Sequence, residues 1–255
     1  MTQPALPLIE EKLPGNIAFD MLLVEGGEYL MGDADEEALD REKPVHRVKL
    51  FTFYLGKYPV TQAVWRAVME ASPDPTKAGE NPSRFKGENR PVEQVSWNDV
   101  QKFLKKLNSL TKQDYRLPTE AEWEFAARGG LHSEEYLYAG SDKLRQVGWY
   151  DENRDDETHE VGQKLKNELG LYDMSGNVYE WCYDWYDEKY YEECYKKGVV
   201  EDPQGPVQGD YRVVRGGSYF GSALNCRAAS RHGHGPANRG SSFGFRLALS
   251  LQSVG

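Results

Sequence analysis

Two histidines one residue apart, His232 and His234, are the first residues in this chain whose types and spacing could do chemistry. Alternate side chains of a strand point to the same face, so a strand here would place both imidazoles together. Two imidazoles supply half of a zinc site. The other histidines, at 46, 132 and 159, are scattered and offer no third ligand at a metal-site spacing. We therefore expect no zinc here.

Three cysteines, Cys182, Cys194 and Cys226, are the candidates for thiol chemistry. They show no CxxC spacing, and an odd number cannot pair completely. We expect three reduced thiols in or near the core. A disulfide between Cys182 and Cys194 is the alternative for an exported protein. The sequence also lacks a hydrolase nucleophile elbow, a phosphate-binding loop and a dinucleotide fingerprint.

Composition limits the classes of partner. The net charge of −10 argues against a general binder of nucleic acid or anionic membranes. No run of 18 apolar residues is present, so no transmembrane helix is expected. The first 15 residues lack the basic flank and apolar core of a signal peptide, which leaves export open.

The segment from 219 to 243, called the 219–243 window below, has an unusual composition. It contains no Lys, Glu, Gln, Met or Trp, although Lys and Glu together make up 41 of the 255 residues. Random placement would put roughly four of these two residue types in 25 positions. Its Gly, Ser, His and Asn residues argue against a buried segment. Its interspersed Arg, Pro and aromatic residues argue against a flexible linker.

The elements that position these residues can be predicted from caps and periodicity. Three helices are expected after Thr61, after Ser96 and after Thr119, where Thr119 and Glu122 form a capping box. We expect a hairpin over 21–33 and a strand over 46–60. Residues 1–17 form an irregular lead-in and residues 18–255 a single domain in this prediction.

Seven motifs in a fixed order resemble one known family. They are PVTQAVW (59–65), RPVEQVSWNDV (90–100), YRLPTEAEWEFAARGG (115–130), GLYDMSGNVYEW (170–181), VVRGGSY (213–219), CRAASR (226–231) and GFRLA (244–248). In order and spacing they resemble the formylglycine-generating enzyme (sulfatase-modifying factor) family over about 18–249. The resemblance implies an α+β, C-type lectin-like fold, loop-rich, with about three helices and short antiparallel strands.

Within that resemblance, the copper pair of the enzymes is incomplete. Members that oxidise a substrate cysteine bind copper with two cysteines five apart, soon after the RGGS motif. The corresponding positions here are Gly221 and Cys226. One thiolate cannot build a two-thiolate copper(I) site. No spacing indicates that His232 or His234 replaces the missing ligand, so we expect no catalysis and no required cofactor.

The resemblance also implies a calcium site, because enzymes of the family hold structural calcium around the GLYDMSGNVYEW turn. The matching ligands would be the side chains of Asp173 and Glu180 and the carbonyls of Gly176 and Val178. Hard oxygen ligands on a turn suit calcium. In the alternative interpretation, Asn177 and Glu180 tie the turn without metal.

The glycines and arginines of the C-terminal motifs look structural. Gly216 and Gly217 are expected to allow close backbone approach or positive φ. Arg215, Arg227 and Arg246 lie in a segment that lacks acids from Tyr211 onward, so they are expected to reach backbone carbonyls or carboxylates elsewhere.

The composition of the 219–243 window also has a genetic interpretation. Codons of the form NNY, reached when the adenines of an Asn codon are randomised, cannot encode the five absent residue types. The pattern resembles the variable region of diversity-generating retroelement variable proteins, most closely the spirochaete (Treponema) type built on this fold. The implied variable, ligand-binding positions are Tyr219, Phe220, Gly221, Ser222, Leu224, Asn225, Ser230, His232, Gly233, His234, Gly235, Ala237, Asn238, Gly240, Ser241, Ser242 and Phe243.

Three functional hypotheses follow. The first is a non-enzymatic, receptor-like protein that presents a diversified surface to a macromolecular ligand, expected to be a protein and not nucleic acid. The second is a formylglycine-generating-type oxidoreductase with an altered metal site, and the third an unvaried structural or sensory domain. We expect a monomer at the cell surface or outside the cell, with a lipid anchor on a longer precursor as one route. A cytoplasmic location is the alternative.

Overall fold

The computed structural model describes residues 8–36, 38–71 and 80–251. Their strands form three sheets, all pairs being antiparallel except β4 with β8 and β7 with β11. The first sheet, in spatial order, contains β1 (Leu8–Leu13), β2 (Ile17–Val24), β5 (Phe53–Gly56), β12 (Ala248–Ser250) and β6 (Tyr115–Arg116). The second contains β10 (Arg231–His234), β9 (Arg212–Arg215), β7 (Tyr179–Trp185) and β11 (Phe243–Phe245). The third contains β3 (Glu28–Met31), β4 (His46–Lys49) and β8 (Val199–Glu201).

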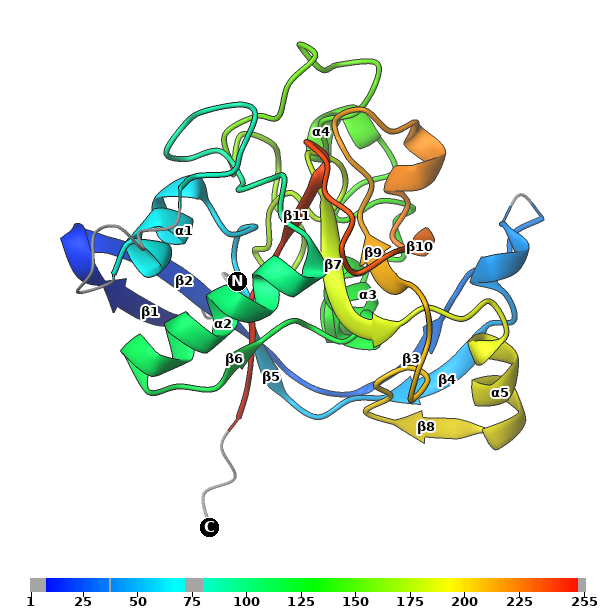
Figure 1. The fold of residues 1–255 in the computed structure, drawn as a ribbon. Helices are drawn as coiled ribbons and strands as arrows, with labels where there is room; N and C mark the ends of the chain where they lie inside the picture. The colour runs from blue at the N-terminus through cyan, green and yellow to red at the C-terminus, as the bar shows by residue number, and fades with distance from the viewer. Residues whose placement is uncertain (1–7, 37, 72–79, 252–255) are drawn as a thin grey trace, which may run out of the picture.

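Five α-helices surround these sheets in the described part of the chain, two more than expected. They are α1 (Gln62–Met69), α2 (Trp97–Thr111), α3 (Glu120–Ala127), the single turn α4 (Leu144–Val147) and α5 (Tyr190–Lys197). The three predicted caps are confirmed, because Thr61, Ser96 and Thr119 each accept a hydrogen bond from the backbone of the first helical turn. Long loops between α3 and β7 lie beside the orange and red C-terminal segments (Figure 1).

Three sequence-based boundaries are wrong. Residues 8–13 are not an irregular lead-in, because β1 pairs with β2 along its whole length. Residues 21–33 are not a hairpin either. β2 pairs with β1 and β5, whereas β3 pairs with β4 in another sheet. The expected strand over 46–60 is two strands, β4 and β5, in different sheets.

The switch between sheets explains the two glycines that suggested a hairpin. A Cβ on Gly26 would lie 2.3 Å from the carbonyl oxygen of Leu50, so a side chain has no room where the two segments cross. The Gly27 carbonyl accepts a hydrogen bond of 2.9 Å from the Leu50 amide. These glycines therefore permit a close backbone crossing and not a turn.

The helix α3 positions the C-terminal sheet from within the core. All eight of its residues are buried, including three glutamates. Trp123 is fully buried in an apolar cluster that also contains Cys182 of β7 and Val213 of β9. Trp181 is fully buried in a second cluster with residues of α1 and α2. Buried carboxylates need partners. Glu120 and Glu124 find arginines in the C-terminal segment, whereas Glu122 pairs with Arg116 of β6.

Candidate functional site

The 219–243 window spans both edges of the second sheet. After β9 the chain passes through a short 3₁₀ helix, Ala223–Cys226, and returns as β10 at one edge. Residues 235–242 then cross to β11 at the other edge. The carbonyls of Pro236 and Gly240 accept hydrogen bonds from the amides of Asn98 and Gln94 near the start of α2. The window is thus held as a scaffolded loop.

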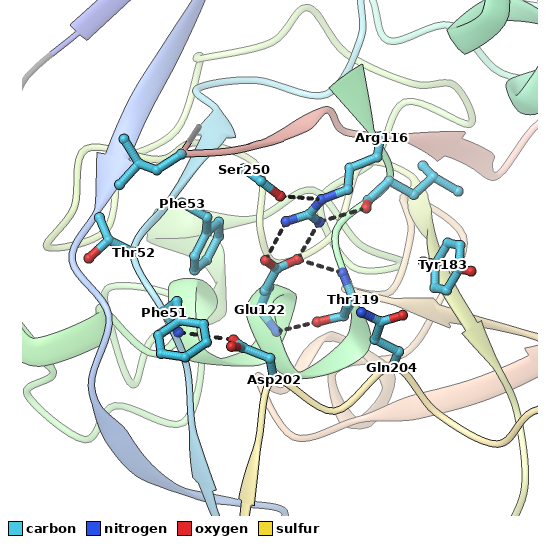
Figure 2. A pocket seen from close by; sticks show the side chains of 12 residues that line it. Phe51, Thr52, Phe53, Arg116, Thr119, Glu122, Tyr183, Asp202, Gln204 and Ser250 are labelled. Atoms are coloured by element: carbon cyan, nitrogen blue, oxygen red, sulfur yellow. Dashed lines mark hydrogen bonds and ion pairs between the residues drawn. The ribbon is translucent and has the colours of Figure 1, made fainter. Parts of the chain in front are cut away.

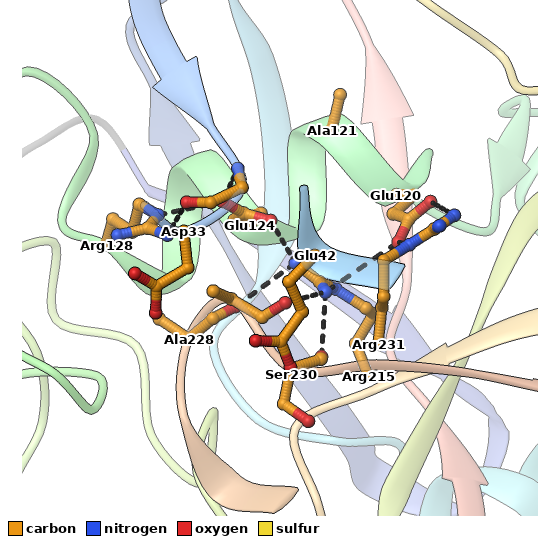
Figure 3. Close-up of polar contacts among 12 residues, drawn as sticks. Asp33, Glu42, Glu120, Ala121, Glu124, Arg128, Arg215, Ala228, Ser230 and Arg231 are labelled. Atoms are coloured by element: carbon orange, nitrogen blue, oxygen red, sulfur yellow. Dashed lines mark hydrogen bonds and ion pairs between the residues drawn. The ribbon is translucent and has the colours of Figure 1, made fainter. Parts of the chain in front are cut away.

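Arginines within and beside the window bind carboxylates of α3. Arg231 donates from Nε and Nη2 to the two oxygens of Glu120, at 2.6 and 2.8 Å. Arg215 donates to Glu124 and to the carbonyls of Ala229 and Ser230, the latter two at 2.8 and 2.7 Å. Figure 3 shows the Arg215 side chain reaching toward Glu124, Ala228 and Ser230, with Arg231 against Glu120 beside it. Both arginines are fully buried.

Two more arginines bind buried carboxylates in the same way. These arginine–carboxylate pairs are called the framework below. Arg227 donates to Glu42 at 2.7 Å and to Asp33 at 2.8 Å. Arg246 donates to both oxygens of Glu180 and to two backbone carbonyls. The prediction that Arg215, Arg227 and Arg246 reach carbonyls or carboxylates elsewhere is confirmed. Removing one partner of such a buried pair lowers the free energy of unfolding far more than removing one partner of a surface pair, since the other charge stays buried and unpaired.

The electrostatics of α3 follow from these pairs. Burial by itself would raise the pKa of Glu124, but the neighbouring guanidinium groups of Arg128 and Arg215 lower it below its usual value. Arg128 lies one helical turn away and donates to Glu124 at 2.9 Å. The carboxylate therefore stays charged inside the core and fixes the backbone that leads into the window.

The two histidines lie on alternate positions of β10, as expected, and each ring contacts an aromatic ring. The His232 ring contacts Tyr179 at 5.6 Å between centroids, and the His234 ring contacts Phe243 at 4.7 Å. Burial and the nearby Arg41 lower the pKa of His232 to about 3. His232 Nε2 lies 3.2 Å from Nη2 of Arg41, so the neutral imidazole accepts this hydrogen bond. Across the described residues, no group of three or more His, Cys, Asp and Glu is placed to hold a metal.

The candidate variable positions differ in exposure. Tyr219 and Ser230 are buried, with 5% and 1% of their surface exposed, which corrects their expected place on a contact surface. Tyr219 instead packs its ring on Phe85 and bonds Ser241 through its hydroxyl. Exposed positions are Phe220, Ser222, Leu224, Ala237 and Asn238. The half-buried positions are Gly221, Asn225, His232, Gly233, His234, Gly235, Gly240, Ser241, Ser242 and Phe243.

The glycines in and beside the window fall into two groups, those whose backbone conformation favours glycine and those whose conformation does not. Gly216 and Gly217 have φ of +88° and +73°, which confirms that these positions favour glycine. The four glycines of the window, at 221, 233, 235 and 240, have no such φ. A Cβ on Gly221 would meet only ordinary contacts, whereas one on Gly233 would lie 2.6 Å from the Tyr186 ring. The backbone conformation of the window therefore does not require glycine. A larger residue at position 233 would, however, require the Tyr186 ring to move.

The three cysteines are free and buried, as expected for reduced thiols. Burial raises the pKa of Cys226 to about 12, so almost no thiolate forms at neutral pH. The Cys226 Sγ packs so closely on Gly217 that a Cβ there would lie 2.5 Å from it. Gly221 supplies no ligand atom from a side chain. These residues do not fit a two-thiolate copper site.

The turn proposed for calcium is satisfied internally. Both Glu180 oxygens accept hydrogen bonds from Arg246, and one also accepts from Trp123 Nε1 at 2.7 Å. Asp173 accepts from the Gly162 amide and from Asn177. Burial raises the pKa of Asp173 to about 6. The geometry favours the alternative in which the turn is tied without metal, because calcium would compete with Arg246 for Glu180.

A cavity of about 420 Å³ lies outside the window, between β5, β6 and the start of α3. Figure 2 shows its main polar pair, in which Arg116 binds Glu122 through two hydrogen bonds of 2.6 and 2.7 Å. Glu122 also accepts from the Thr119 amide in the capping box. The Glu122 carboxylate thus has structural partners. The second acid in the lining, Asp202, accepts a hydrogen bond of 2.9 Å from the Phe51 amide, and burial raises its pKa.

Sequence reasoning missed the residues that flank the window. The exposed Phe220 ring lies 4.2 Å from the Arg154 guanidinium carbon, and Arg41 and Phe85 contact the window from distant segments. The framework acids were also missed. Glu120 and Glu124 lie one helical turn apart, and this spacing on a helix otherwise rich in buried residues was the available signal.

Comparisons with known proteins identify the family. The family described as "Sulfatase-modifying factor enzyme 1-like domain" matches residues 10–251. "Chaperone protein LppX" of Paenibacillus barcinonensis is 33% identical, over 92% of this chain and 90% of its own length. "Formylglycine-generating enzyme" of Streptomyces coelicolor is 33% identical, over 88% and 87%. The chain spans 40% of a Chlamydia pneumoniae relative titled "Serine/threonine-protein kinase pkn1", at 34% identity.

Among solved structures, "Treponema denticola variable protein 1" matches with a TM-score of 0.84 and 30% identity, over 96% of this chain and 99% of that one. The α+β, C-type lectin-like fold, expected from the motifs, and the likeness to a variable protein, expected from the composition of the 219–243 window, are confirmed. In the described part of the chain, no helix is both long and apolar enough to span a bilayer. The chain belongs to the formylglycine-generating-enzyme (sulfatase-modifying factor enzyme 1-like) family.

Proposed function

We propose that this chain is a non-catalytic ligand-binding protein whose 219–243 window contacts a macromolecular ligand, most simply a protein. We further propose that the window is diversified by a retroelement. One observation carries the proposal. Arg227, Arg231 and, just after the window, Arg246 are held by buried carboxylates. Most of the candidate variable positions are instead exposed or half-buried, and the glycines among them have no positive φ.

Rigid support under adaptable side chains is what a binding loop requires. The framework arginines hold the backbone of the window from below, so the exposed positions can change without moving it. Exposed or half-buried aromatic rings, Phe220 and Phe243, would supply anchoring contacts. Small residues such as Ser222 and Asn238 would supply adaptable polar contacts, as in antibody loops.

A catalytic alternative is supported by the relatives titled formylglycine-generating enzyme. An oxidoreductase of this chain would have to work with Cys226 alone, and that thiol is buried with a raised pKa. The test is oxygen-dependent conversion of a cysteine-containing sulfatase peptide with copper supplied. Conversion that is lost in Cys226→Ser would establish the enzyme and overturn the non-catalytic proposal.

The genetic part of the proposal is tested in the DNA around the gene. We expect a near-copy of the last ~100 bases with adenines where the exposed codons vary, next to a reverse transcriptase gene. Sequencing the window in many isolates should then show changes at exposed positions such as 220, 222 and 237, and none at Arg227, Arg231 or Arg246. Absence of the repeat, or uniform windows in all isolates, would overturn diversification.

Display at the cell surface or outside the cell would suit such a binder, and we include it in the proposal. Protease treatment of intact cells, followed by detection of the protein with an antibody, tests it. Loss of the protein from intact cells is the expected result. Protection until lysis would point to the cytoplasmic alternative.

A further inference from the structure

Arg212 is a buried cation clamped between two indole rings. Its guanidinium carbon lies 3.8 Å from the centroid of the Trp97 ring and 3.5 Å from that of the Trp185 ring. The residue is only 8% exposed. Stacking on both faces fixes the plane of the guanidinium and leaves its edges as the only route to further hydrogen bonds.

This arginine has no carboxylate partner among the residues that the structure describes. Nη1 donates to the carbonyl of Tyr183, and the enclosed Nε has no partner. No hydrogen bond from Nη2 is present within residues 8–36, 38–71 and 80–251. The nearby carboxyl of Asp184 accepts from the Glu120 amide instead. Burial lowers the pKa of Arg212, as expected for a cation without a compensating charge.

Other arginines in the same molecule show what this edge normally binds. Arg231 holds Glu120 through Nε and Nη2, and Arg246 holds Glu180 through the same two nitrogens. Arg239 uses the same edge on Asp99. The Nε and Nη2 edge matches the two oxygens of a carboxylate. In Arg212 that edge has no hydrogen-bond partner among the residues that the structure describes.

Arg212 also borders the proposed binding surface. It lies on β9 directly opposite His234 of β10. It precedes the 219–243 window in sequence, so it would remain the same whichever residues occupy the window. Its neighbours Trp97 and Trp185 likewise lie outside the window.

We propose that the Trp97–Arg212–Trp185 stack is a fixed carboxylate-binding site that receives an Asp or Glu side chain of the protein ligand at the border of the window. The inference rests on the proposed function for the identity of the ligand. The chemistry of the site itself does not depend on diversification. A carboxylate would lie in the plane of the guanidinium, between the indole rings, and accept from Nη2 and, after a small opening, from Nε.

The test uses the whole chain and a small probe, N-acetyl-L-glutamate, with N-acetyl-L-glutamine as the uncharged control at matched ionic strength. The side-chain Nε–H signal of Arg212 and the indole N–H signals of Trp97 and Trp185 are followed by NMR. We expect saturable shifts with the glutamate probe and none with the glutamine probe. Equal responses to both probes, or no response to either, would overturn the site.

Three variants guard against a trivial result. Arg212→Met should abolish the indole shifts, whereas Arg84→Met, which removes an exposed arginine beside Phe85, should leave them unchanged. If Arg212→Met does not fold, Arg212→Lys retains the charge but not the planar edge. It should bind the probe roughly tenfold more weakly, the effect of losing one charged hydrogen bond. Unweakened binding by Arg212→Lys would contradict the assignment.

This titration and the DNA test can fail independently. A missing template repeat would leave the glutamate titration of this single chain unaffected. A negative titration would leave a diversified surface intact but without this fixed contact.

Discussion

Arg231 and His232 are neighbours in β10, yet Arg231 belongs to the buried framework and His232 to the candidate contact surface. Arg231 is fully buried against Glu120 of α3, whereas His232 is half-buried and contacts Tyr179 on the opposite face. The alternation of a strand makes this possible, since successive side chains point to opposite faces. One short segment can therefore be framework on one face and contact surface on the other.

The same contrast recurs in the loop before β10. Gly217 has a φ of +73° and packs on Cys226, whereas Gly221, four residues later, has neither constraint. Tolerance to substitution in this fold therefore belongs to individual positions and not to whole loops. Stability measurements on matched pairs of positions test this distinction.

The largest effect is expected for Arg231→Met. It removes both hydrogen bonds that Arg231 gives to the buried Glu120 carboxylate and leaves only the more distant Arg215, at 3.7 Å, as a counter-charge. We expect this to cost about 3 to 5 kcal/mol of unfolding free energy. The matched control is Arg239→Met, because the Arg239 side chain is 57% exposed in its pair with Asp99. That change should cost about 0 to 1 kcal/mol. Urea unfolding measures both, and similar losses for the two variants would contradict the distinction.

Next in size is Gly217→Ala. Alanine would be forced into a left-handed backbone conformation, and its Cβ would lie 2.5 Å from the Cys226 sulfur. We expect a loss of about 2 to 4 kcal/mol by urea unfolding. Gly221→Ala should stay within about 0.5 kcal/mol of the parent, as for an unconstrained surface site. If Gly221→Ala were the more damaging change, the window would not be the tolerant region.

A smaller, pH-dependent effect is expected at Glu93, a framework carboxylate without an arginine. It is fully buried, its Oε2 has no hydrogen-bond partner in the described part of the chain, and burial raises its pKa to about 7. The unfolded group titrates near 4.5, so the folded state binds more protons between these values. Its contribution to stability is therefore full below about pH 4.5 and falls as the pH rises through 7.

Unfolding free energies of the parent and Glu93→Gln at pH 5 and pH 8 test this sign. The variant should gain about 1 to 3 kcal/mol relative to the parent between the two pH values. Glu88→Gln is the control, because Glu88 is exposed and paired with Arg66. Equal pH dependence in the parent and Glu93→Gln would show that the carboxylate is not desolvated as described.

The smallest effect separates positions within the window. Phe220 is 65% exposed, so Phe220→Ala should change the unfolding free energy by less than about 1 kcal/mol. Phe243 stacks on Trp181 at 5.4 Å, so Phe243→Ala should cost about 1 to 3 kcal/mol, less than a fully buried ring. Thermal unfolding of the two variants checks the order. The reverse order would place the adaptable surface elsewhere.

Much of this fold could be predicted from local signals. The caps at Thr61, Ser96 and Thr119 located three helices, because a hydroxyl that bonds the first helical turn is encoded within a few residues. The absence of acids after Tyr211 correctly indicated that Arg215 and Arg246 reach distant partners. The motif order gave the fold class.

What could not be predicted depends on contacts between distant segments. The sequence around Arg227 does not predict that this arginine binds Asp33, which lies 194 residues away in the chain. The sequence likewise could not show that Tyr219 is buried by Phe85, since this depends on how two loops meet. β1 was not predicted, because its six residues carry only a short alternating pattern and their pairing with β2 determines their conformation.

The most direct test of the central claim is a comparison of two libraries sorted for folded protein by protease resistance. One randomises Phe220, Gly221, Ser222, Leu224, Ala237 and Asn238 with NNY codons; the other applies the same codons to Gly216, Gly217, Arg215, Arg227, Arg231 and Arg246. The account predicts that most members of the first library stay folded and that almost none of the second do. Equal survival of the two libraries would contradict the division of this segment into framework and surface.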